Sequence, residues 1–530
     1  MSASIQAPVS EKPTSFRRGL AATIGKNTIF GVTASLAQIG TRLVTVPIVI
    51  VHLGVDGYGI WAIIMTLAAY MRFGSIGIKS AFQKYVAEAT GSGDFSKVNR
   101  LLSTGSFGML AISLVGFIPI PFFSRQLAHL AGIPDRFLSS SASAIVVLGA
   151  IMLFSNFGSV YEAIVMGGHR IDLSRKFVTF FTVLEAIAIV IVLHYGYGLF
   201  AMATIMAVSE LCYLGCCYVA AKRILPVINV SLKHLSRSTL RELVTFAGSY
   251  QLVNILEIVY QSILPVAILR VFGANVGGLL AVANRLVAAA LMVQDALILP
   301  ILSGGSMVYG TGSAENMRIL LTKTLKVSLL LCLLPLAFVS AFGGIIIFAW
   351  TGQRDPMLTT AVWMISLAAL FKALSLVELV LYRVSGKSLL DNIRQGMRIG
   401  MILIVSVLAP QLGVYGVLMG LAVVELISMV FMFVVLTRTF EGFTAKLILP
   451  DGAKLVLATA ATVAVGIAAT YIEPSWVVNE RILSVVKLVI VSVVTLIAAL
   501  PAFLLTRSFS NSEVRAAIDA FKRRTLKTAG

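Results

Sequence analysis

Long apolar runs alternate with short polar segments along the whole chain. A run of about 20 apolar residues is long enough to cross a hydrocarbon core about 30 Å thick as an α-helix. The pattern predicts fourteen membrane-spanning helices, at 27–51, 57–79, 101–124, 141–166, 177–195, 197–220, 245–270, 276–303, 323–349, 358–382, 390–410, 414–437, 452–471 and 483–505. We therefore expect an all-α polytopic membrane protein.

Two short glycine-rich turns indicate an internal repeat. The stretch LGVDGYGIWA at 53–62 matches FGANVGGLLA at 272–281, which places Gly54 opposite Gly273 and Gly59 opposite Gly278. Tyr-Gly pairs at 197–198 and 415–416 recur at nearly the same offset. We interpret the glycines of 53–62 as a tight outer turn, where a positive φ costs glycine nothing. The repeat predicts two pseudo-symmetric six-helix lobes of one orientation, plus two extra C-terminal helices.

This interpretation divides the chain into six parts. They are a cytoplasmic N-terminal segment (1–26), an N-lobe with spans one to six (27–220), a cytoplasmic inter-lobe connector (221–244), a C-lobe with spans seven to twelve (245–438), spans thirteen and fourteen (452–505) and a basic amphipathic cytoplasmic tail (506–530).

The basic excess fits membrane topology rather than nucleic acid. The formal net charge is +19, and hydrophobic residues make up 58% of the chain. With the N-terminus inside, the predicted inner segments hold about five times as many Lys and Arg residues as the outer ones, as the positive-inside rule requires. Anionic lipid is a sufficient partner for that charge. We expect both termini in the cytoplasm and no nucleic-acid partner.

The chain lacks the marks of an enzyme. There is no GxxxxGK[ST] loop for ATP, and the five histidines have no metal-site spacing. No predicted outer loop is long enough for a catalytic domain, and the four cysteines fall inside predicted spans. We expect no enzymatic activity, no metal and no cofactor, although a coupling H⁺ or Na⁺ is compatible with the acidic residues.

Ionisable side chains at membrane depth carry the functional signal, because a lone charge there is costly and faces a cavity or a partner. The predicted cationic cavity for an anionic substrate contains Arg42, Arg285, Lys372 and Arg72. Coupling or charge-balancing roles fall to Glu257, Asp295, Glu378 and Glu162, and polar cavity-lining roles to Gln38, Asn254, Gln261 and Asn284. Several of these residues form helical stripes, such as Asn254, Glu257 and Gln261.

Two other interpretations of these charges remain open. The charges could be structural ion pairs, such as Arg42 with Glu257 or Arg285 with Glu210. Arg72 lies nearer the cytoplasmic face, so its side chain could instead reach the interface.

The N-terminal segment 42–94 resembles a known family. The resemblance rests on Leu-Gly and Tyr-Gly-Ile-Trp within 53–61, Gly-Ser-Ile-Gly-Ile at 74–78 and Lys-Tyr-Val-Ala-Glu at 84–88. By these motifs the segment resembles Wzx-type polysaccharide and O-antigen flippases, which belong to the multidrug/oligosaccharidyl-lipid/polysaccharide exporter superfamily.

The resemblance implies two lobes around a central cavity and alternating access. It also implies that an undecaprenyl-diphosphate-linked oligosaccharide, a polysaccharide or lipopolysaccharide precursor, moves from the inner to the outer leaflet of a bacterial inner membrane. Arg42 and Arg285 are the positions that could match the family's essential arginines. Spans thirteen and fourteen could shape a groove for a lipid tail, as in the related lipid II flippases.

Three alternatives stay beside this expectation. A cation-coupled multidrug antiporter shares the superfamily but would favour acidic and aromatic residues in its cavity. A lipid II-type flippase shares the two extra helices. A non-transporting scaffold could dock glycan polymerase or other synthesis enzymes, although a surface-lying amphipathic helix is the simpler interpretation of the basic tail.

Overall fold

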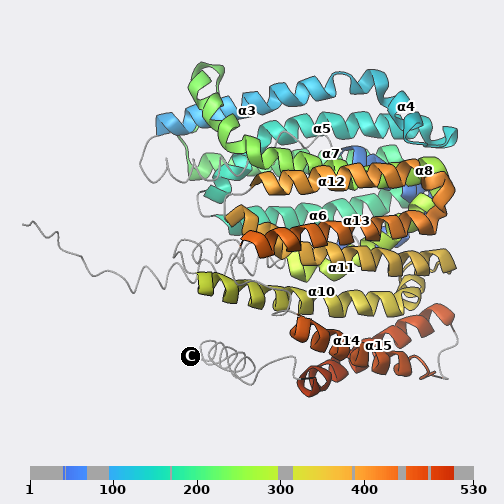
Figure 1. Ribbon diagram of the computed structural model, residues 1–530. Helices are drawn as coiled ribbons and strands as arrows, with labels where there is room; N and C mark the ends of the chain where they lie inside the picture. Colours follow the sequence, from blue (N-terminus) through green and yellow to red (C-terminus); the bar gives the residue numbers. More distant parts are fainter. Residues whose placement is uncertain are drawn as a thin grey trace, which may run out of the picture. The chain divides into compact units, whose positions relative to one another are not determined.

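The computed structural model describes residues 40–41, 43–68, 95–167, 170–295, 314–384, 388–439, 449–474 and 479–506 (Figure 1). After a helix at Leu43–Ala68, the order is α3 (Phe95–Phe117), α4 (Ile120–Leu130), α5 (Asp135–Gly167), α6 (Ile171–His194), α7 (Leu199–Ile224), the 3-10 turn η2 (Leu232–His234), α8 (Arg237–Asp295), α10 (Ala314–Thr351), α11 (Pro356–Val384), α12 (Ser388–Val407), α13 (Ala409–Thr439), α14 (Leu449–Ala469) and α15 (Glu480–Leu505). The described residues contain no strand.

Eleven of the described helices are long and apolar enough to cross a membrane. The helix at 43–68 and α8 each count once, although Gly54 and Gly273 interrupt their helical geometry with positive φ angles. α12 is not among the eleven, and it carries Asp391, Arg394 and Arg398. The all-α polytopic class is therefore confirmed, and every predicted span in the described segments overlaps a helix.

The end predicted for span three is wrong. The sequence pattern continued it to residue 124, but α3 ends at Phe117 and a separate helix, α4, begins at Ile120. Pro119 lies between them, and proline has no backbone N–H to donate to the preceding turn. Its carbonyl oxygen accepts from the N–H of Phe123 at 3.0 Å, which starts the new helix. α4 exposes Phe122 and Phe123, so it resembles an interfacial helix more than the end of a span.

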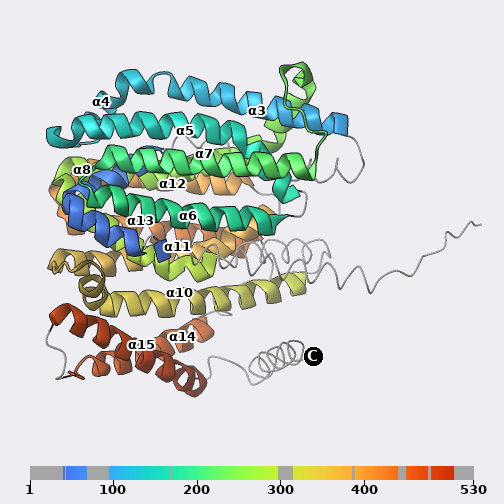
Figure 2. The same ribbon diagram turned by 180° about the vertical axis from the view of Figure 1, so that it is seen from behind.

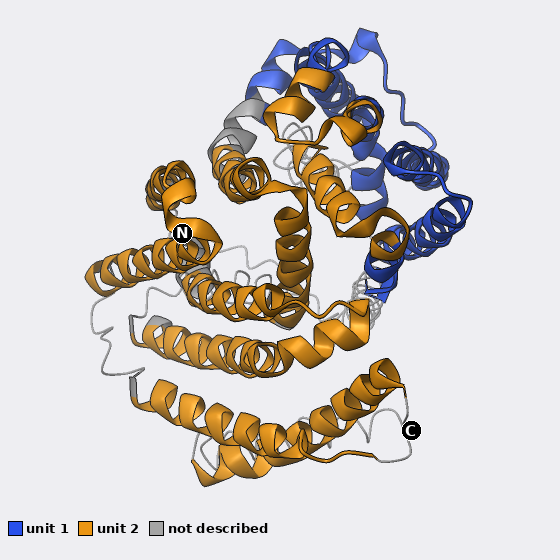
Figure 3. Cartoon of the chain, turned by 90° about the vertical axis from the view of Figure 1, so that its right-hand side faces the viewer, with its two compact units in different colours: residues 1–48, 71–124, 143–248 blue, residues 49–70, 125–142, 249–530 orange. Residues whose placement is uncertain are grey.

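The chain forms two compact units, coloured separately in Figure 3. Unit 1 comprises residues 1–48, 71–124 and 143–248, and unit 2 comprises residues 49–70, 125–142 and 249–530. Within unit 1, α6 packs against α7, as Figure 2 shows. Within unit 2, α10 packs against α11, α14 and α15, and α11 packs against α12 and α13. The lobe ranges 27–220 and 245–438 stay a prediction.

Six glycines have a positive φ among the described residues, and they form three pairs at almost constant spacing. Gly54 and Gly273 have φ angles of 74° and 86°, Gly132 and Gly352 of 83° and 75°, and Gly196 and Gly413 of 81° and 67°. The members of each pair lie about 220 residues apart, the offset at which the sequence turns repeat. Side chains rarely adopt this backbone conformation, so glycine marks each break. This spacing is the structural counterpart of the duplication seen in the sequence.

The first part of the segment after α7 is fastened to α3 within unit 1. Five hydrogen bonds join them. Asn99 Nδ2 donates to the Val227 carbonyl at 3.2 Å, and Ser103 Oγ donates to the Asn229 carbonyl at 3.4 Å. The backbone N–H groups of Asn229, Ser231 and Ser236 donate to the side chains of Asn99, Ser103 and Thr104 at 2.9, 3.1 and 3.0 Å. Polar side chains on the inner face of α3 thus satisfy backbone groups that have no helical partner. The predicted connector 221–244 therefore begins as part of α7 and ends in α8.

Asn479 caps the N-terminus of α15. Its Oδ1 accepts from the backbone N–H of Arg481 at 2.9 Å and of Ile482 at 3.2 Å. Substitution Asn479→Ala removes the acceptor for both donors and is expected to cost about 1 kcal/mol of stability. Thermal unfolding of the purified protein in detergent measures the loss, and Asn479→Asp, which keeps an acceptor, should retain the wild-type melting temperature. Equal melting of the Ala variant and the wild type would contradict the cap.

Candidate functional site: a buried ion network in unit 2

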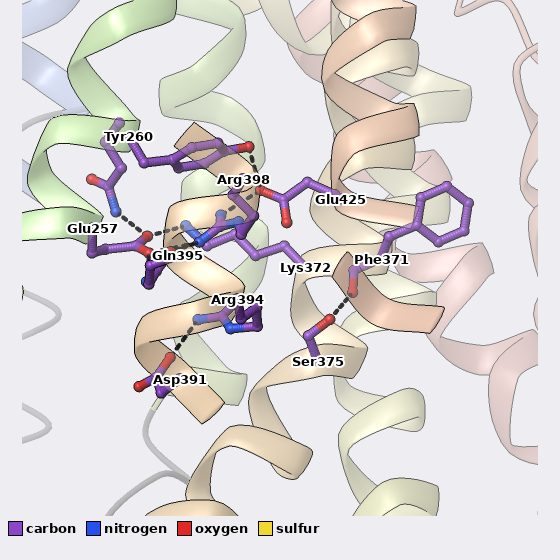
Figure 4. Close-up of polar contacts among 11 residues, drawn as sticks. Glu257, Tyr260, Phe371, Lys372, Ser375, Asp391, Arg394, Gln395, Arg398 and Glu425 are labelled. Carbon is purple, nitrogen blue, oxygen red and sulfur yellow. Dashed lines mark hydrogen bonds and ion pairs between the residues drawn. The ribbon is translucent and has the colours of Figure 1, made fainter. Parts of the chain in front are cut away.

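Four helices of unit 2 bring charged side chains together. Glu257 comes from α8, Lys372 from α11, Arg398 from α12 and Glu425 from α13 (Figure 4). Two carboxylates face two cations, so the four side chains have no net formal charge. Neutrality makes the cluster tolerable in an apolar environment, where an unpaired charge is expensive.

Arg398 is the centre of this network. Its side chain has 0% exposure, and its guanidinium joins both carboxylates. Nη1 donates to Glu257 Oε2 at 2.7 Å, and Nη2 donates to Glu425 Oε1 at 2.5 Å. The guanidinium carbon also lies 3.7 Å from the centroid of the Tyr260 ring, in cation–π geometry. A planar fork of donors suits this bridging position better than an ammonium group would.

The Glu257 carboxylate is fully occupied by protein donors. Oε1 accepts from Gln261 Nε2 at 2.7 Å and from Lys372 Nζ at 3.2 Å. Oε2 accepts from Gln395 Nε2 at 2.5 Å and from Arg398 at 2.7 Å. A carboxylate has about four lone-pair sites, so these four donors leave none open. A proton or a Na⁺ ion could reach Glu257 only after one of the donors moves away.

Glu425 differs from Glu257 in having an unused oxygen. Oε1 accepts from Tyr260 Oη at 2.8 Å and from Arg398. Oε2 is buried and has no hydrogen-bond partner among the described residues. The side chain is only 3% exposed, and Arg398 is the only cation among the described residues that pairs with it. The fold around Glu425 consequently depends on Arg398.

Lys372 is the loosest member of the network. Its side chain is 42% exposed, against 0% for Arg398, and its distance to Glu257 is the longest of the four donor distances. If its ammonium moved to another anion, Arg398 and two amides would still hold Glu257. The geometry thus leaves one cation at the edge of the network that an incoming anion could attract.

Residues 391–398 of α12 supply a buried polar face. Asp391, Arg394, Gln395 and Arg398 follow helical spacing and lie on one side of the helix. Arg394 Nη2 donates to Asp391 Oδ1 at 3.1 Å, and both side chains are buried, so this pair is neutral as well. Arg394 and Arg398 fall inside the predicted span 390–410, but sequence reasoning gave neither residue a role. In the structure their charges are compensated by Asp391, Glu257 and Glu425.

The structure brings three of the predicted site residues together: Glu257, Lys372 and Gln261. Arg398, Gln395, Glu425 and Tyr260 complete the network, and sequence reasoning did not assign them a role. Arg285 and Asn284 lie further along α8 and are exposed. Among the carboxylates whose side chains the structure describes, none forms an ion pair with Arg285 within 4 Å. Glu162 is buried in α5 of unit 1.

The other predicted residues lie outside what the structure describes. Arg42, Arg72 and Gln38 fall outside the described residues altogether. Asn254, Asp295 and Glu378 lie on described helices, but their side chains are not described. Glu210, proposed as a partner for Arg285, accepts a hydrogen bond from Ser155 Oγ at 2.5 Å. The described residues contain no group of three or more His, Cys, Asp or Glu that could hold a metal ion.

Comparison with known proteins finds relatives by structure alone. No family model matches the sequence, and no curated protein matches it. An inward-facing multidrug resistance MATE family transporter of the MOP superfamily matches with a TM-score of 0.64 at 15% identity, over 76% of this chain and 96% of that one. The lipid II flippase MurJ, in an inward closed conformation, matches with a TM-score of 0.66 at 14% identity, over 90% of this chain and 99% of that one.

A third match is a MOP superfamily transporter from Pyrococcus furiosus. Its TM-score is 0.55 at 14% identity, over 78% of this chain and 93% of that one, and its description reports a binding pocket of reverse polarity. At such identities the likeness shows the fold alone. The solved structures nevertheless agree with one another and with the superfamily to which the sequence turns pointed. The chain therefore has the fold of the MOP superfamily transporters.

Proposed function

We propose that the protein is a flippase for a lipid-linked oligosaccharide. It would move an undecaprenyl-diphosphate-linked glycan precursor from the inner to the outer leaflet of a bacterial inner membrane, by alternating access, with both termini in the cytoplasm. The fold supports a transporter. The match to the lipid II flippase extends over 90% of the chain, against 76–78% for the multidrug and Pyrococcus transporters, which favours a flippase over a drug exporter.

Two accessible cations inside membrane-spanning helices of unit 2 carry the proposal. Lys372 is half-exposed at the edge of a network that can spare it, and Arg285 is exposed within the span Ile255–Met292. Cations at this depth do not face lipid stably, so they favour a water-filled path or an anionic substrate. A diphosphate offers several oxygens to such donors, and guanidinium binds phosphate oxygens through two hydrogen bonds.

The membrane potential would favour the same transport direction. An inside-negative potential drives negative charge outward by about 2.3 kcal/mol per charge per 100 mV. Basic side chains along the path would screen the diphosphate from the apolar core while the polyprenyl tail stays in lipid. A coupling H⁺ or Na⁺ is not needed for this direction, and the occupied oxygens of Glu257 give such an ion no ready site.

The rival functions make different demands on Lys372. A multidrug antiporter carries cations, so a cation in its path would weaken substrate binding and its removal would help. A lipid II-type flippase would need the same cations for its diphosphate and differs from our proposal only in the sugar. A scaffold for glycan synthesis enzymes would be indifferent to Lys372.

Lys372→Gln is expected to lower the flipping rate about tenfold or more at subsaturating substrate, because a charge-assisted hydrogen bond to phosphate is lost. The assay uses proteoliposomes and a fluorescent polyprenyl-diphosphate oligosaccharide, with accessibility of the label to an external quencher as the readout. Arg285→Gln should act in the same direction. The same glycan and lipid II, tested in parallel, would separate the two flippase candidates.

Lys454→Gln is the matched control. Lys454 is 43% exposed and lies 3.6 Å from Asp451, so it resembles Lys372 in exposure and pairing but belongs to another helix. Flipping should be unchanged in this variant. Unimpaired flipping in Lys372→Gln and Arg285→Gln would remove the support for the anion path. Faster efflux of cationic drugs in these variants, with no glycolipid flipping in the wild type, would favour the antiporter.

A further inference from the structure

Unit 1 contains a cavity that the proposed transport path does not use. It lies between α6 and α7 and has a volume of about 1070 Å³, the upper end of the range for ligand pockets in proteins. Both helices belong to unit 1, so the cavity is formed by that unit alone, and it is open on one side. Its lining is Arg170, Leu173, Phe177, Phe181, Cys212, Gly215, Cys216, Val219, Ala220, Arg223 and Ile224.

The charged residues of the lining lie at one end, and the far end is apolar. Arg170 immediately precedes α6, and Arg223 is in the last turn of α7, so both arginines are at one end. Phe177 and Phe181 continue along α6, while Val219, Cys216 and Cys212 continue along α7. Apart from the two arginines, the lining carries no ionisable group besides the cysteine thiols. An amphiphile with an anionic head and an apolar tail matches this division.

The length of the cavity matches one leaflet of a bilayer. Arg170 and Phe181 are separated by a rise of about 16 Å along α6, at about 1.5 Å per residue. Half of a hydrocarbon core about 30 Å thick is about 15 Å. With the arginines at headgroup level, the far end of the cavity would reach the bilayer centre. A single acyl chain of one leaflet therefore fits the cavity, whereas a chain that crosses both leaflets does not.

Both arginines line the same end of the cavity and keep donors available there. Arg170 Nε donates to Asp172 Oδ1 at 3.3 Å, which orients the side chain and leaves both terminal nitrogens as donors. The Asp172 side chain is 8% exposed, whereas that of Arg170 is 54% exposed, so the arginine stays accessible although it pairs with a buried acid. Arg223 is exposed, and no carboxylate among the described residues forms an ion pair with it. One arginine is thus compensated and the other brings a net positive charge.

We propose that this cavity binds an anionic glycerophospholipid, with one acyl chain between α6 and α7 and the phosphate between Arg170 and Arg223. The charge separation selects an anionic head over a zwitterionic one, and the cavity length selects an acyl chain. The site is separate from the ion network in unit 2 and does not depend on which substrate the protein transports. By the Lys and Arg distribution of the sequence, the lipid would belong to the cytoplasmic leaflet.

Native mass spectrometry of the detergent-purified full chain tests the proposal. Wild-type protein is mixed with increasing phosphatidylglycerol or phosphatidylethanolamine, and the fraction that retains one lipid is measured. We expect selective retention of phosphatidylglycerol. The double variant Arg170→Gln, Arg223→Gln should lower that retention by at least about tenfold, because each basic residue near an anionic headgroup contributes about a fivefold factor.

A second variant tests the apolar part independently. A Cβ built at Gly215 has no heavy atom within 4 Å, and Gly215 lines the cavity, so Gly215→Leu would add apolar volume there and leave both arginines in place. Lipid retention should fall here as well. The matched controls are Gly116→Leu on α3, where a Cβ also meets open space, and the double variant Arg237→Gln, Arg241→Gln at the exposed start of α8. Both controls should retain lipid as the wild type does.

Each result either supports or overturns the assignment. Equal retention of the two lipids by the wild type would overturn the proposed preference for an anionic headgroup. If the double arginine variant retained phosphatidylglycerol as the wild type does, the proposed phosphate contact would be overturned. If Gly215→Leu did so, the proposed position of the acyl chain would be overturned. Glycolipid flipping is measured separately, so loss of the proposed transport function would leave this test unaffected.

Discussion

Arg398→Met is expected to destabilise the protein by about 3–5 kcal/mol, the cost of breaking a buried ion pair from one side. The substitution leaves Glu425, which is 3% exposed, with the Tyr260 hydroxyl as its remaining described donor. It also removes the shortest described link between α12 and α13. The apparent melting temperature in detergent should fall clearly below that of the wild type.

A compensating variant makes this expectation specific to charge. Arg398→Met leaves the network one negative charge in excess, and a second change, Glu425→Gln, restores neutrality. The double variant should therefore recover most of the lost stability, because replacing both partners of a buried pair costs far less than removing one. The two substitutions touch the same contact, so strong non-additivity is expected.

Arg318→Met provides the control. Arg318 pairs with Glu315 at 2.8 Å, but the two side chains are 38% and 60% exposed, and such a surface pair contributes about 0–1 kcal/mol. This control should melt near the wild type. The network would not be the structural centre of unit 2 if Arg398→Met had the same melting temperature as this control. The same would follow if the double variant melted no higher than Arg398→Met.

Hydrophobic periodicity predicted most of this fold because the bilayer leaves the chain few choices. A helix satisfies its own backbone groups, so an apolar run of the right length in lipid becomes a helix. That rule places α5, α7, α10 and α15 close to the predicted spans. It places α3 less well, because Pro119 interrupts a run whose hydropathy continues across the break.

The candidate site was harder to predict because its charges cancel only in three dimensions. Arg394 and Arg398 fall inside the predicted span 390–410, but a hydropathy pattern does not show which residues compensate their charges. Their counter-charges are Asp391, one turn away, and Glu257, far along the chain. The spacing of 391, 394, 395 and 398 on one helical face was the available signal. Polar residues at helical spacing indicate one polar face of a helix, whereas a solvated loop has no helical period.

The glycine turn at 53–62 was explained only in part by its sequence. Gly54 has the expected positive φ of 74°, so it makes the backbone break. Gly57 and Gly59 are not among the positive-φ glycines. Gly59 instead lies against Gly278, its equivalent in the repeat, and both belong to unit 2. Close approach of two backbones, rather than turn geometry, explains glycine at this position.

Gly59→Val and Gly278→Val are expected to destabilise the protein by about 1–3 kcal/mol each, the usual cost of overpacking, and by more if the helices cannot separate. A Cβ at position 59 would lie 2.5 Å from the Ala274 carbonyl oxygen and 2.5 Å from the Gly278 nitrogen. A Cβ at position 278 would collide with the Val55 carbonyl oxygen. These atoms are backbone, so no side-chain rotation relieves the clash.

The double variant separates a shared contact from two independent defects. Once one valine has pushed the helix at 43–68 away from α8, the second has less to displace, so the double variant should melt only slightly below the worse single variant. Gly400→Ala on α12 is the matched control, because a Cβ there meets open space and alanine favours the helix. That control should melt at or above the wild-type temperature. Additive losses of stability in the double variant would mean that the two glycines do not share one contact. Wild-type melting temperatures of both single variants would mean that the close approach of the glycines is not required for the fold.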